Sequence, residues 1–91
     1  MAGDGMKGAD TGQLRTLSKT FGHQHTNLHE LITALNNATK TSPDYWKGPR
    51  ADRFRDDWEQ LRPTLSKFVD SLERARKETN SAAEANDQIN G

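Results

Sequence analysis

The sequence predicts an all-α protein, an antiparallel helix-turn-helix hairpin that dimerises into a four-helix bundle. Two long segments carry apolar residues at alternating spacings of three and four, which is the pattern of an amphipathic helix. A short stretch at 42–48, which contains Pro43 and Gly48, separates them. Leu, Ile, Val and Phe number only 14 of the 91 residues, so a single hairpin needs a partner to cover its apolar stripes.

We expect the first helix at about residues 11–41. Asp10 is its predicted N-cap, with Gln13 as the capping-box partner three residues later. In a heptad register with Leu14 at position a, Gln24 is a polar residue at position d, and Ile32 widens the stripe to position e. The first helix is expected to contribute these residues to the dimer and hairpin seam: Leu14, Leu17, Phe21, Gln24, Leu28, Leu31 and Leu35.

We expect the second helix at about 49–83, with Trp58 at position a and Val69 at position e. Pro63 falls at position f and should bend the helix rather than end it. The apolar pattern is weak beyond residue 78, so we expect a flexible tail at 84–91. The glycine-rich residues 1–9 predict a disordered arm at the other end. The helical hairpin itself is expected at 10–83. The seam residues of the second helix are Phe54, Trp58, Leu61, Leu65, Phe68 and Leu72.

The turn at 42–48 has a local explanation. A residue before proline is disfavoured in the helical region, which stops the first helix near Ser42-Pro43. Gly48 can adopt a positive φ without steric cost, and Pro49 suits the first turn of a new helix. Trp46 is expected to plug the open end of the hairpin, because a large aromatic residue in a loop needs an apolar surface.

Charge and composition argue against several classes of function. The 13 basic residues balance 13 acidic ones, whereas a nucleic-acid binder has a basic surplus. The chain has no cysteine for a disulfide or thiolate site. No apolar run approaches the length of a membrane span or of a signal-peptide core, so export would have to proceed without a cleavable signal.

The polar residues do not form a recognisable catalytic or metal site. His25 and His29 are four residues apart, but no cysteine or carboxylate is placed to complete a shell, so these two and His23 are expected to be solvated. Arg53–Asp57 and Arg55–Glu59 are expected to be ion pairs on an outward face. We therefore expect no enzyme, no metal and no other cofactor.

Two equal amphipathic helices and a central Trp46-Lys47-Gly48 turn in a chain of this length resemble the WXG family. These are small secreted helical hairpins of type VII secretion, typified by the early secreted antigenic target of mycobacteria. The resemblance implies a homo- or heterodimeric four-helix bundle, exported folded by a membrane ATPase machine. It also implies that Trp46 and Gly48 form half of an export mark.

The family's tail signal, Y-x-x-x-D/E, is incomplete in this sequence. Asp87 would require tyrosine at Ala83, and Glu84 would require it at Asn80. The resemblance therefore implies the signal-less half of a heterodimer, exported with a second subunit of the family. The alternative is an intracellular helical adaptor that binds another coiled coil. Membrane insertion is disfavoured, because neither stripe forms a strongly apolar, basic-flanked face.

Overall fold

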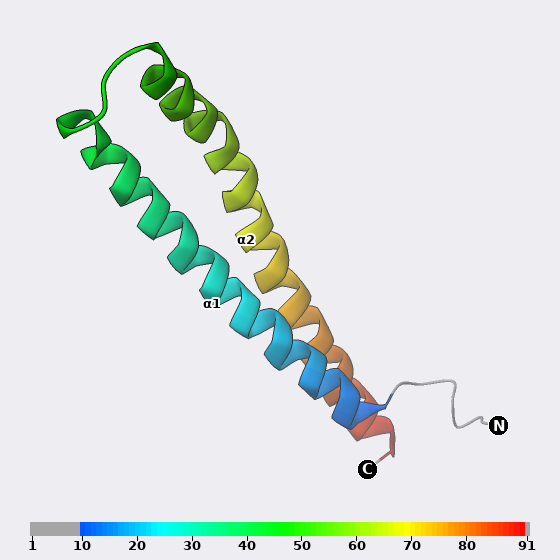
Figure 1. Cartoon of the computed structure of the whole chain (residues 1–91). Helices are drawn as coiled ribbons and strands as arrows, with labels where there is room; N and C mark the ends of the chain where they lie inside the picture. The colour runs from blue at the N-terminus through cyan, green and yellow to red at the C-terminus, as the bar shows by residue number, and fades with distance from the viewer. Residues whose placement is uncertain (1–9, 91) are drawn as a thin grey trace. The chain divides into compact units, whose positions relative to one another are not determined.

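The computed structural model describes residues 10–90, and it is helical throughout apart from the turn (Figure 1). Helix α1 spans Thr11–Thr41, the 3-10 helix η2 spans Ser42–Asp44, and helix α2 spans Pro49–Asn90. The predicted all-α helical hairpin is confirmed. The predicted arm at 1–9 lies outside the described residues.

Helix α1 begins where its capping signal predicts. The Gln13 backbone N–H donates to Asp10 Oδ1 at 3.0 Å, which satisfies one of the orphan donors of the first turn. The Leu14 N–H donates to the Asp10 carbonyl at 2.9 Å and starts the helical ladder. Asp10 therefore fixes the first residue of α1 through both its side chain and its backbone.

The contacts of the chain divide it into two compact units, which are described separately. The turn unit comprises residues 25–71, in which α1 leads through the turn into α2 (Figure 1). Trp58 is 6% exposed there, and its indole N–H donates to Asn36 Oδ1 at 3.3 Å across the two helices. Ala51 is fully buried at the start of α2. A large aromatic residue with its polar atom satisfied thus anchors the turn unit.

The end unit contains the described residues at 10–24 and 72–90. Polar bonds join its two helices: Ser18 Oγ donates to the Arg76 carbonyl at 2.9 Å, and Asn86 Nδ2 donates to Thr11 Oγ1 at 2.6 Å. Arg15 and Asp87 form an ion pair. Ser18 is buried, so its bond avoids the cost of an unsatisfied hydroxyl group.

Gly22 has a packing role in the end unit. A Cβ atom at this position would lie 3.1 Å from Arg76 Cδ, a close contact. Glu73 holds the Arg76 side chain through bonds of 2.7 and 2.8 Å and, by these bonds and its charge, raises the pKa of Arg76. The missing side chain of Gly22 therefore leaves room for the aliphatic part of Arg76.

Helix α2 continues through Pro63 and ends at Asn90, beyond the residue 83 at which we expected the helix to stop. Ala83 is fully buried in the end unit, and a side chain this small allows close packing. The apolar pattern did not predict that the helix continues past residue 83, because alanine contributes little to hydrophobic periodicity although it favours helix strongly. The flexibility predicted for 84–91 stays a prediction.

Candidate functional site

The candidate site is the turn that carries Trp46 and Gly48. After α1 ends, the backbone N–H groups of Tyr45 and Trp46 both donate to the Ser42 carbonyl, at 3.1 and 2.8 Å. Gly48 adopts a φ of 114°, which other residues rarely tolerate. Pro49 then starts α2, and the Asp52 N–H donates to the Gly48 carbonyl at 3.0 Å. The local chemistry predicted for Gly48 and Pro49 is therefore confirmed.

The turn leaves its aromatic residues partly accessible. Trp46 is 38% exposed, and its ring lies against Phe54 with centroids 5.5 Å apart and planes at 45°. Tyr45 is 75% exposed. One face of the Trp46 ring thus has an aromatic neighbour from α2, while part of the side chain remains available to a partner.

Arg55 connects three segments around the turn. Its Nη1 donates to Ser42 Oγ at 2.9 Å and to the Trp46 carbonyl at 3.2 Å, while Nη2 donates to Asp52 Oδ1 at 3.3 Å. Ser42 is buried, and its hydroxyl donates onward to the Thr39 carbonyl at 2.7 Å. One guanidinium group therefore joins the start of η2, the loop and the first turn of α2.

This arrangement corrects one of the two ion pairs expected from the sequence, Arg55–Glu59. Arg55 binds Asp52 rather than Glu59, and Glu59 instead binds Arg62 at 2.9 Å. The i,i+4 rule failed because it considers a helix in isolation, whereas the turn brings carbonyl and hydroxyl acceptors over the start of α2. Position e of the heptad, next to the seam, was the available signal that Arg55 faces inward.

The predicted seam residues separate into two sets by exposure. At position a, Trp58 is buried, and Leu14, Phe21, Leu28, Leu65 and Leu72 are half-buried, whereas Leu35 is exposed. Every position e from Ser18 to Thr39 in α1 and from Arg55 to Ala83 in α2 is buried or half-buried. Positions a and e therefore supply the contacts between α1 and α2 within each unit.

All the predicted seam residues at position d are exposed. We call these residues the outer row: Leu17, Gln24, Leu31, Phe54, Leu61 and Phe68. Phe68 is 58% exposed and Leu61 is 48% exposed. Antiparallel helices that pack through positions a and e present position d on the same side, so the outer-row members of the turn unit share one face.

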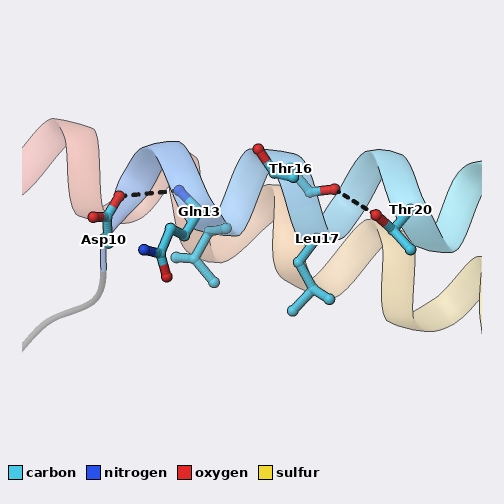
Figure 2. Close-up of a pocket in the computed structure, with 6 residues that line it drawn as sticks. Asp10, Gln13, Thr16, Leu17 and Thr20 are labelled. Atoms are coloured by element: carbon cyan, nitrogen blue, oxygen red, sulfur yellow. Dashed lines mark hydrogen bonds between the residues drawn. The ribbon is translucent and has the colours of Figure 1, made fainter.

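A shallow groove in the end unit adjoins Leu17, which projects from α1 in Figure 2. Its volume is about 580 Å³. Two bonds drawn in the figure hold its rim: the Gln13 N–H to Asp10, and the Thr20 hydroxyl to the Thr16 carbonyl at 3.1 Å. The groove is lined by the N-cap residue of α1 and by residues of its first three turns: Asp10, Gln13, Leu14, Thr16, Leu17 and Thr20.

A second cavity, in the turn unit, holds two of the three histidines. Its volume is about 410 Å³, and His25 and His29 line it together with Ile32, Val69 and two polar residues of α2, Ser66 and Asp70. Within residues 10–90, no group of three or more His, Cys, Asp or Glu side chains is arranged to hold a metal ion.

Neither α1 nor α2, over the residues described, combines the length and apolar character needed to cross a membrane.

Comparison with known proteins places these features in a family. The family described as "WXG100: Proteins of 100 residues with WXG" matches residues 8–88. The type VII secretion system extracellular protein A of Staphylococcus aureus is 27% identical over 73 residues, which cover 80% of this chain and 75% of the relative, in strains USA300, Newman and COL alike. No solved structure matches the chain. A central Trp46-x-Gly48 turn between two long helices, within a match that covers most of the sequence, shows that the chain belongs to the WXG100 family.

Proposed function

We propose that this protein is a type VII secretion substrate or a co-secreted partner, exported as a folded helical dimer and acting through protein–protein contacts. The observation that carries the proposal is the match to staphylococcal proteins named as extracellular proteins of that system. Export then proceeds without a cleavable signal peptide, and the protein is cytoplasmic before export. Its action is binding rather than catalysis, with no cofactor.

The outer row supports dimerisation. Leu31, Phe54, Leu61 and Phe68 lie exposed in the turn unit, where water contacts apolar surface that a second hairpin could cover. The α1–α2 contacts alone bury few large side chains, because Trp58 is the only large apolar residue classed as buried within residues 10–88. A partner with a complementary apolar row would complete a four-helix bundle. We propose a second WXG-family subunit as that partner, with a heterodimer favoured over a homodimer.

The end of α2 supports the heterodimer. Ala83, where the family's tail signal would require tyrosine, is fully buried, and Asp87 is engaged by Arg15. A tyrosine at position 83 would meet the closely packed α1. We therefore propose that the partner's tail supplies the tyrosine, that Trp46 and Gly48 supply the turn of the composite mark, and that the secretion ATPase recognises the two together.

Secretion is tested by blotting culture supernatants from a host with an intact type VII system and from the same host lacking the ATPase. The proposal requires the protein in the first supernatant only. Retention of the protein inside both hosts, with a cytoplasmic marker confirming intact cells, would instead support the intracellular adaptor. Native mass spectrometry of the chain alone, and then with the product of the neighbouring gene, separates the homodimer from the heterodimer.

The role of the turn is tested with Trp46→Ala. We expect this variant to lose export while it still co-purifies with the partner, because Trp46 lies outside the outer row. Phe21→Ala, which removes a half-buried aromatic residue far from the turn in sequence, is the control for general loss of packing. Normal export of Trp46→Ala would remove the turn from the proposed mark.

A further inference from the structure

We propose that Arg55 is the positioning residue of the WXG turn and fixes how Trp46 is presented to a partner. The inference begins with the Trp46 carbonyl, which precedes the start of α2 and faces Arg55 Nη1 at 3.2 Å. Backbone carbonyls outside a helix need another donor, and a side chain commonly provides it. Arg55 therefore replaces a helical hydrogen bond at the residue that defines the motif.

Two consecutive residues of α2 hold Trp46 at different points. Phe54 contacts the indole ring, with centroids 5.5 Å apart, and Arg55 binds the backbone carbonyl. The ring contact alone would allow the loop to pivot about the indole, whereas the second attachment restricts that motion. The side chain of Arg55 is only 21% exposed, and its bond to Ser42 is partly buried, so the guanidinium group is held in place beside the Trp46 carbonyl.

The chemistry favours arginine over lysine at this position. Two nitrogens of one planar group reach acceptors on three segments, namely Ser42 Oγ, the Trp46 carbonyl and Asp52 Oδ1. A lysine keeps the charge but offers a single nitrogen, which cannot reproduce the fork. The buried Ser42 hydroxyl, which donates to Thr39 and accepts from Arg55, would lose its second bond.

The test compares Arg55→Lys and Arg55→Ala with the native protein, and Arg53→Ala serves as the control because Arg53 is an exposed arginine two residues away. Hydrogen exchange followed by NMR reports the backbone N–H groups of Tyr45 and Trp46, which bind the Ser42 carbonyl. We expect both Arg55 variants to exchange on the order of tenfold faster at these two amides, with the α2 amides near Trp58 unchanged and Arg53→Ala native throughout.

Unchanged protection at Tyr45 and Trp46 in Arg55→Lys would overturn the inference. An equal loss of protection throughout the turn unit would also overturn it, because Arg55 would then stabilise the whole unit rather than position the turn. If Arg55→Ala fails to fold, the inference is tested with Arg55→Lys and Ser42→Ala. Ser42→Ala removes only one of the three acceptors of Arg55.

The consequence for export rests on the proposed function and is measured separately. With the partner co-expressed, Arg55→Lys should lose export in parallel with the loosened turn while co-purification persists. Full export of a variant whose turn amides exchange faster would overturn the functional part of the inference. The proposed export role of the turn would stand or fall independently on Trp46→Ala.

Discussion

Gly22→Ala should leave the free energy of unfolding nearly unchanged, although alanine normally favours a helix interior by about 0.8–1.0 kcal/mol over glycine. The expected gain is offset because the new Cβ would lie 3.1 Å from Arg76 Cδ, and Glu73 holds the Arg76 side chain in place. We expect a net change within about 0.5 kcal/mol. In an Arg76→Ala background the obstruction is gone, and the same substitution should stabilise by about 0.8–1.0 kcal/mol.

The measurement is a double-mutant cycle by urea denaturation at one fixed protein concentration, since association would make stability depend on concentration. Ala34→Gly provides a control on an exposed position of α1 and should cost about 1 kcal/mol in both backgrounds. If Gly22→Ala gives its full stabilisation in the native background, Arg76 moves freely and the packing explanation of Gly22 is wrong. The Ser18 bond survives in every variant, because its acceptor is the Arg76 backbone carbonyl.

Three further predictions concern the two sets of seam residues. Trp58→Ala should cost roughly 3–5 kcal/mol in a denaturant melt, and a loss below about 1 kcal/mol would show that Trp58 contributes little to the core. Phe68→Glu should prevent assembly in sedimentation experiments, whereas the control Lys67→Glu, at an adjacent exposed position, should not. Equal assembly of the two variants would show that the outer row is not part of the interface. Gln24→Leu should raise the melting temperature of the assembled protein and broaden its choice of partner in competition pull-downs, and a lower melting temperature would indicate that Gln24 makes a specific buried bond in the assembly.

The elements of the fold were predictable because their signals are local. Asp10 defines the start of α1 through a side-chain cap on the Gln13 backbone N–H, which needs no tertiary information. Gly48 and Pro49 define the change from loop to α2 through backbone preferences that the structure reproduces. The heptad spacing in turn predicted that both flanking segments are long helices.

The division of the apolar stripe between two surfaces was not predictable from spacing. Periodicity places Leu61 and Leu65 on one stripe, yet Leu61 is exposed and Leu65 is half-buried. A stripe that covers positions a, d and e can turn either edge toward the neighbouring helix. Small and polar residues at position e, such as Ser18 and Ala83, allow close approach, and their low hydrophobicity hides that role from a search for apolar residues.

The sequence identifies the residues of the candidate turn but not the contacts that hold the turn in place. The sequence motif identifies Trp46 and Gly48, whereas the charge pattern places Arg55 on a solvated helix face. Its contacts depend on the path of the loop, which returns the Trp46 carbonyl and Ser42 hydroxyl to the start of α2. Such long-range polar contacts depend on tertiary structure, so pair rules for single helices do not find them.

The distribution of side-chain types links stability to association. Within residues 10–88, the buried apolar residues are Ala51, Trp58 and Ala83, and no large side chain is completely enclosed. Larger apolar groups, including Phe54 and Phe68, occupy the outer row instead. Hydrophobic stabilisation grows with the apolar area removed from water. Most of the further stabilisation available to this chain would therefore come from burying the side chains of the outer row. If a second hairpin covers that row, as proposed, we expect the protein to gain much of its stability on association, which would couple folding to the choice of partner.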